Sequence, residues 1–213
     1  MYISWYGESC FKIQNSDKTI LIDPEAPRKV GLRGPNFKSD ILLLSSKDGE
    51  KVRPKSDLKS DSDSRSENQA FFLIEGPGEY EIKGVFIEGI PFEKEKKQTV
   101  IYRIIFEEII FGFLGAEVDS LNDEQIEKIG VVDVLFIPVK ERVEEIINSI
   151  EPRIVIPHSY QISGLKVKRE TIEKFLKKLG KKNIEALEKF FLNKKTLSGE
   201  FKQEEIIILK PKV

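Results

Sequence analysis

The sequence predicts one α/β domain (α+β in some classifications) in which helices cover β-sheets. The chain has 213 residues, of which 39% are hydrophobic and 33% charged, and this length is enough for one sizeable hydrophobic core. Its first half is a succession of short apolar segments, and its second half alternates such segments with stretches of helical period. Strands followed by alternating strands and helices are typical of sheets covered by helices rather than of a pure β-sandwich.

Turn-forming residues separate the strands expected in the first half of the chain. Asp23-Pro24 ends one of these segments and braces the loop that follows, because proline cannot donate to a sheet ladder. The continuous apolar run at 41–44 is typical of a strand buried on both faces. The strands are expected at 2–6, 10–14, 19–22, 41–44, 71–74, 80–90 with a break at Lys83-Gly84, 99–106 and 109–113.

Helix signals begin in the second half. Asn122 and Gln125 form a capping box, and Gly130 is a C-terminal stop. Thr171 opens another helix, whose apolar residues repeat with helical spacing until Gly180 ends it. A third helix is expected at 142–150 and a short helical piece at about 186–191, with strands at 134–139, 154–157 and 205–209.

The segment 51–69 differs from the rest because serines alternate with charged residues through 56–66. Such a segment cannot bury enough apolar surface to offset its ordering entropy. The strand pattern resumes directly afterwards, at Phe71. We therefore predict a mobile loop inside a single domain, 1–213, rather than a linker between two domains.

The charge balance and the hydropathy exclude some classes of partner. The chain has 35 basic and 36 acidic residues, so nothing indicates nucleic acid as a partner. No apolar run approaches the ~20 residues that a membrane span needs. The first residues lack a basic region followed by an apolar stretch, so we expect no secretory signal and a cytoplasmic location.

The chain contains one cysteine and one histidine. A single cysteine excludes an internal disulfide and a zinc site built on Cys-x-x-Cys pairs. A single histidine, His158, excludes every metal site that needs two imidazoles. We interpret His158 as a hydrogen-bonded structural imidazole and Cys10 as a small core residue.

Several segments, in this order, resemble the metallo-β-lactamase superfamily, and in particular its small single-domain zinc-dependent hydrolases. The resemblance runs from residue 5 to about residue 180 and implies a four-layer αββα sandwich with its site at one edge of the two sheets. The segments that carry it are Trp5-Tyr6-Gly7-Glu8-Ser9-Cys10-Phe11, 19–24, 76–81, Phe113-Leu114-Gly115-Ala116, 122–139 and Ile154-Val155-Ile156-Pro157-His158-Ser159-Tyr160.

The resemblance also implies where metal ligands stand in active relatives, and this chain departs from the pattern at each position. The loop after 41–44 reads His-x-His-x-Asp-His in relatives, and here it reads Ser46-Lys47-Asp48-Gly49-Glu50-Lys51. The next histidine ligand falls near Glu93 or Lys94, and the bridging aspartate is replaced by Ala116, with Phe113 in place of the histidine before it. The last histidine ligand maps onto Ser159, and the histidine of Gly-His-Ser-Cys-Phe maps onto Glu8.

These replacements remove the nitrogen ligands that bind zinc tightly, so we expect this chain to bind no zinc. We assign no catalytic residue. Asp48 and Glu50, together with His158, form the residual polar site that the sequence allows, and they would bind Mg²⁺ or Ca²⁺ at most weakly. A nucleophilic Ser45 or Ser46 with His158 as its base is disfavoured against turn residues after a buried strand.

The sequence therefore favours a catalytically degenerate metallo-β-lactamase-fold protein that serves as a binding or structural protein, with a protein partner or a second copy of itself. The alternative is a hydrolase that acts on a small ester or phosphoester through an oxygen-ligand metal site. That site would use Asp48, Glu50 and Glu93, whose loops are expected to converge.

Overall fold

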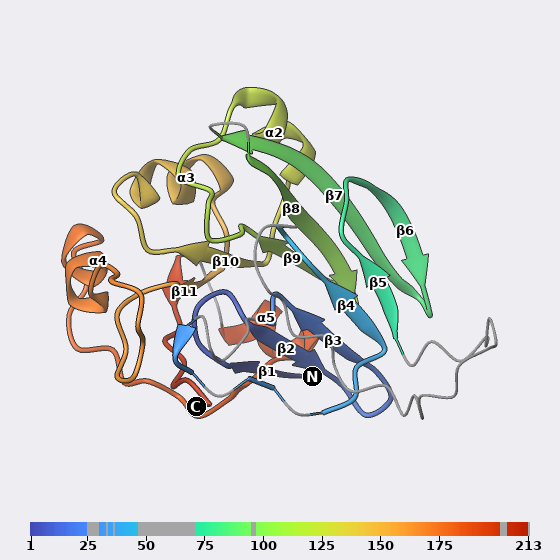
Figure 1. Cartoon of the computed structure of the whole chain (residues 1–213), viewed down its shortest axis with the longest axis horizontal. Coiled ribbons are helices and arrows are strands. Elements are labelled where there is room, and N and C mark those ends of the chain that lie inside the picture. The colour runs from blue at the N-terminus through green and yellow to red at the C-terminus, as the bar shows by residue number, and fades with distance from the viewer. Residues whose placement is uncertain are drawn as a thin grey trace.

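Two β-sheets face each other and form the centre of the molecule (Figure 1). The structure, a computed structural model, describes residues 1–24, 30–32, 34–35, 37–46, 71–94, 97–200 and 204–212, without the side chains of residues 94, 97 and 200. The six-stranded sheet has the order β12 (Phe190–Phe191), β1 (Tyr2–Trp5), β2 (Phe11–Gln14), β3 (Thr19–Ile22), β4 (Ile41–Leu43) and β5 (Phe72–Ile74). The seven-stranded sheet has the order β13 (Glu205–Ile206), β11 (Ile154–His158), β10 (Val134–Pro138), β9 (Ile109–Phe113), β8 (Lys97–Phe106), β7 (Val85–Lys94) and β6 (Gly78–Ile82).

In the six-stranded sheet, the side chains alternate between two apolar environments. β1, β2 and β3 are antiparallel neighbours, whereas β4 runs parallel to both β3 and β5. The large core shared with the other sheet contains Ile20, Ile22 and the first and last residues of β4. Leu21 and Leu42, between them in sequence, lie in a smaller cluster with Cys10 and Leu44. Because successive strand residues point to opposite faces, this smaller cluster lies on the outer face of the sheet.

The seven-stranded sheet changes from antiparallel to parallel along the chain. β6 to β9 form an antiparallel meander, and β9, β10, β11 and β13 are parallel. Every residue of β10 and β11 is buried, as expected for parallel strands covered on both faces. Helices α2 (Asp123–Ile129) and α3 (Val143–Ile150) lie over this sheet on the side away from β1–β3 (Figure 1).

The predicted helix caps are present. The side chain of Asn122 accepts from the N–H of Gln125, and the Gln125 side chain accepts from the N–H of Asn122, so the capping box closes α2. Thr171 caps α4 (Ile172–Lys178) by accepting from the N–H of Lys174. None of the described helices is long and apolar enough to cross a membrane.

The prediction of a short helical piece at about 186–191 is wrong. Phe190 pairs with Ile3 and Phe191 with Tyr2 as strand β12, and Leu187 makes a bridge to Leu209. The open edge of β1 satisfies this backbone, so tertiary pairing overrides the local apolar pattern. A helix instead follows as α5 (Lys194–Glu200), capped by Asn193, whose side chain accepts from the N–H of Thr196. The serine-rich segment 51–69, predicted to be mobile, lies outside the described residues.

Candidate functional site

The loops after β3, β4, β9 and β11 meet at one edge of the two sheets. The Nε2 atom of His158, the last residue of β11, lies 2.9 Å from the carbonyl oxygen of Leu114, just after β9. A Cβ atom placed on Gly115 would lie 2.6 Å from Oγ of Ser45, so the loop after β4 closely approaches this segment. The chain thus brings these loops together at the place where the resemblance puts the site.

Asp23 and Ser45 join two of these loops. The carboxylate of Asp23 accepts from the Ser45 N–H at 2.7 Å and also from the Ser45 hydroxyl. Both residues are buried, and Asp23 has a positive φ of 44°. Asp23 therefore follows the end of β3 directly and fixes the position of Ser45 just after β4.

His158 is held in the core as a neutral imidazole. A carbonyl oxygen only accepts, so Nε2 carries the hydrogen donated to Leu114, and the Ser159 hydroxyl donates to Nδ1 at 2.9 Å. The ring stacks on Phe113 at 5.6 Å and contacts the edge of Phe11. The pKa of His158 is lowered to about 3, mainly because the ring is buried; the hydrogen bond to Leu114 opposes this shift, and the charges of Arg169 and Lys140 add to it. The ring is buried and hydrogen-bonded at both nitrogens, as the interpretation of His158 as a structural imidazole expects.

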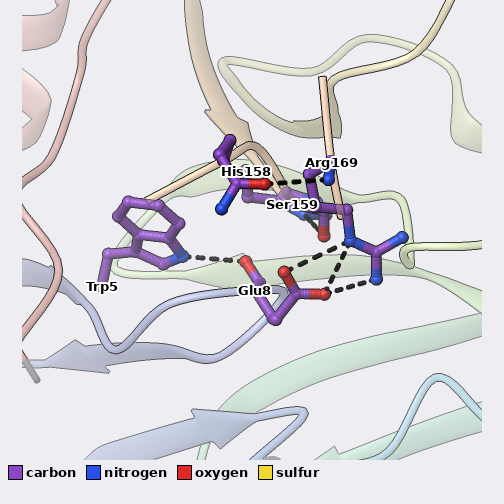
Figure 2. Close-up of polar contacts among 6 residues, drawn as sticks. Trp5, Glu8, His158, Ser159 and Arg169 are labelled. Carbon is purple, nitrogen blue, oxygen red and sulfur yellow. Dashed lines mark hydrogen bonds and ion pairs between the residues drawn. The ribbon is translucent and has the colours of Figure 1, made fainter. Parts of the chain in front are cut away.

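A second polar contact at this edge joins Glu8 to Arg169 (Figure 2). The Glu8 carboxylate accepts from Nε of Arg169 at 3.1 Å and from its Nη2, and the Glu8 side chain is only 4% exposed. The backbone oxygen of Glu8 accepts from Nε1 of Trp5 at 2.8 Å and from the N–H of Ser159 at 3.2 Å. The sequence does not predict this ion pair; its one signal is Glu8, which stands at the position of a family histidine.

Two of the remaining predicted site residues, Glu93 and Ser159, line two different cavities. Glu93, exposed on β7, lines a cavity of about 200 Å³ together with Ser45. Ser159 lines a different cavity, of about 550 Å³, together with Arg169. Ser46 makes a bridge to Thr99, and Ala116 lies half-buried in the turn after β9. Asp48, Glu50 and Lys51 lie outside the described residues.

Neither Ser45 nor Ser46 forms a nucleophile–base pair with His158, because both ring nitrogens of His158 have other partners. The chain Ser159–His158–Leu114 has the connectivity of a nucleophile, a base and an orienting acceptor. A general base works best with a pKa near the operating pH, and the pKa of about 3 leaves His158 a weak base. These contacts therefore favour a structural role.

The comparisons with known proteins agree with this architecture. A family described as "Beta-lactamase superfamily domain" matches residues 2–159, so the chain belongs to this family, within the metallo-β-lactamase superfamily. The resemblance noted from the sequence is confirmed. A comparison with curated proteins gives no match.

Solved structures share the fold over nearly the whole chain. A candidate Zn-dependent hydrolase of the metallo-β-lactamase superfamily from Thermotoga maritima is 24% identical, with a TM-score of 0.75 and 98% of each chain covered. Igni18, a metallo hydrolase from Ignicoccus hospitalis, is 13% identical with a TM-score of 0.58, covering 99% of this chain and 95% of that one. An isothiocyanate hydrolase from Delia radicum gut bacteria is 13% identical with a TM-score of 0.56, covering 84% and 93%. At these identities the likeness establishes the fold.

Proposed function

We propose that this chain is a metal-independent member of the metallo-β-lactamase superfamily, kept as a binding or structural protein rather than as a hydrolase. The observation that carries the proposal is the use made of His158. In the only imidazole of the chain, Nε2 is hydrogen-bonded to a backbone carbonyl and Nδ1 to a serine hydroxyl, inside the hydrophobic core. Its nitrogens are therefore committed to holding β11 against the segment after β9.

The donor set at the family's ligand positions fits zinc poorly. Zinc sites in proteins use thiolate, imidazole and carboxylate ligands. Ala116 offers no donor, while Ser46 and Ser159 offer neutral hydroxyls. Arg169 adds a fixed positive charge next to Ser159, where it would repel a metal cation.

The ion pair supports the same proposal from the structural side. Glu8 connects the turn between β1 and β2 to Arg169, and its backbone oxygen connects that turn to Ser159. In a metalloprotein, the bound ion links loops in this way. Here the salt bridge and backbone contacts supply the connection, which lets the fold persist without a metal and present its loops to a protein partner or a second copy.

A second candidate is a hydrolase that uses oxygen ligands, and one observation favours it. Glu93 shares a cavity with Ser45, and Asp48 and Glu50 follow Ser45 closely in the sequence. Carboxylates gathered there would suit Mg²⁺ or Ca²⁺. The combined change Asp48→Ala and Glu50→Ala separates the candidates, because it abolishes metal-dependent turnover only if these carboxylates hold the metal.

The proposal is tested by assaying untagged protein with p-nitrophenyl acetate and bis-p-nitrophenyl phosphate, each with added Zn²⁺, Mn²⁺ or Mg²⁺ and with a chelator. We expect no turnover above that of a heat-inactivated sample under any condition. Turnover that requires an added metal, disappears with the chelator and is lost in the double alanine variant would overturn the proposal in favour of the second candidate.

A further inference from the structure

The cavity that Ser159 and Arg169 line lies where open α/β sheets bind their ligands. It is bordered by Val139 and Lys140, which directly follow β10, and by Ser159, which directly follows β11. β10 and β11 are adjacent and parallel, so their carboxyl ends open on the same side. Small molecules bind preferentially in crevices beyond the carboxyl ends of such strands. A volume of about 550 Å³ lies in the range of ligand sites.

Charged side chains of both signs line this cavity. The cations are Lys140, Arg142, Lys168 and Arg169, and the acids are Asp119, Glu141 and Glu170. Glu170 pairs with Lys174 at 2.8 Å, and Arg142 pairs with Glu145. The mixture gives only a slight excess of positive charge, so selectivity has to come from the placement of individual donors rather than from a broad field.

Arg169 supplies such a placed donor. Its Nε and Nη2 atoms bind Glu8, which fixes the plane of the guanidinium. Figure 2 shows the third nitrogen turned away from Glu8, and among the described residues Nη1 has no hydrogen-bond partner. A guanidinium held on one edge presents its other N–H groups in the geometry that suits carboxylate and phosphate oxygens.

We propose that this cavity binds the anionic group of a small molecule, a carboxylate or a phosphate, with the Arg169 guanidinium as the fixed cation. Lys168 contributes a second cation to the lining of the cavity, which Ser159 also lines. The inference rests on the proposed function, because it requires that Arg169 and not a metal ion provide the positive charge. It adds the class of ligand that the metal-independent site takes.

The test is a titration of isotopically labelled, untagged protein followed by amide chemical shifts, with sodium phosphate and sodium acetate as separate probes at constant ionic strength. We expect saturable shifts at residues 139–142, 159 and 168–170 with at least one probe. The probe that saturates distinguishes a phosphate site from a carboxylate site. Shifts that stay linear, or that scatter over surface lysines, mean an adventitious ion only and overturn the inference.

Three variants make the test specific. Lys168→Ala leaves the ion pair between Glu8 and Arg169 intact and should lower the affinity for the saturating probe by about threefold or more. The double variant Glu8→Gln with Arg169→Gln removes the fixed cation without leaving a buried charge, and should abolish saturation. Lys195→Ala, an exposed lysine of α5 outside the cavity wall, should bind like the parent protein. Equal binding by the parent and Lys168→Ala contradicts the inference even if the double variant fails to fold.

The inference and the proposed function fail in different ways. Metal content measured on the same sample reports on the proposed function alone. A metal-free protein without saturable binding overturns the anion site and leaves the proposed function standing. A protein that contains stoichiometric metal overturns both, because the cation would then be the metal.

Discussion

The carboxylate of Glu8 holds the guanidinium of Arg169 across 161 positions of sequence, at the edge of the fold where the loops converge. The Glu8 side chain is 4% exposed and that of Arg169 is 29% exposed. Two charges of opposite sign so placed stabilise one another, but each is costly once its partner is gone. The pair therefore joins the turn after β1 to the chain that follows β11.

Replacing Arg169 with alanine should lower the free energy of unfolding by about 3 kcal/mol, because a buried carboxylate is left uncompensated. The partial exposure of Arg169 puts the effect at the lower end of the range for buried pairs. Chemical denaturation followed by circular dichroism measures it. The double change to glutamine at both positions should recover part of the loss, and Arg142→Ala, which breaks the exposed pair with Glu145, should have a far smaller effect.

Ser45→Ala should destabilise the protein by roughly 1–3 kcal/mol, because it removes a donor from the buried carboxylate of Asp23. Ser39→Ala is the matched control. Ser39 is equally buried, at 4% exposure against 3%, but its hydroxyl has no hydrogen-bond partner among the described residues. Thermal unfolding should show a clear loss for Ser45→Ala and no loss for Ser39→Ala; equal losses would contradict the role given to Asp23.

The buried imidazole predicts a specific dependence of stability on pH. His158 stays neutral in the folded protein down to a pH of about 3, whereas in the unfolded chain it binds a proton near 6.5. The unfolded state thus binds more protons, and stability is lost as the pH falls below 6.5. The contribution of His158 to this slope approaches about 1.4 kcal/mol per pH unit. It should vanish in His158→Gln, so the difference in slope between the two proteins isolates it from the carboxylates.

An independent readout uses the fact that His158 is the only histidine. Its ring protons in the NMR spectrum should keep constant chemical shifts between pH 7 and pH 5, since burial holds the pKa of the imidazole far below that range. A titration with a midpoint near 6.5 would show that the ring is solvated. It would also contradict the hydrogen bonds given to Leu114 and Ser159.

Much of the fold is predictable because its signals are local. Turn residues around 15–18 separate β2 from β3, and the Asn122–Gln125 capping box starts α2 where the sequence predicts. The strand that contains Phe190 is not predictable in this way, because it depends on pairing with Ile3, which the local hydrophobic period does not encode. Likewise, Asn193 signals the start of α5 through a cap that an apolar pattern does not reveal.

The candidate site is less predictable, for the same reason. The role of His158 follows from its place in an apolar strand, but its acceptor Leu114 lies 44 residues earlier. Glu8 attracts attention by standing where relatives have histidine, yet nothing in the sequence points to Arg169 as its partner. Pairings between distant loops become visible only once the sheets have brought those loops to one edge.

The most direct test of the metal-independent proposal is the metal content of untagged protein purified from cells supplemented with zinc and manganese, measured by elemental mass spectrometry. A histidine tag would add the ligands that this chain lacks. We expect near-zero metal per chain and a folded state that a chelator does not affect. A content of about one metal ion per chain that survives dialysis would mean that other ligands have rebuilt the site, and it would contradict the proposal that the protein is metal-independent.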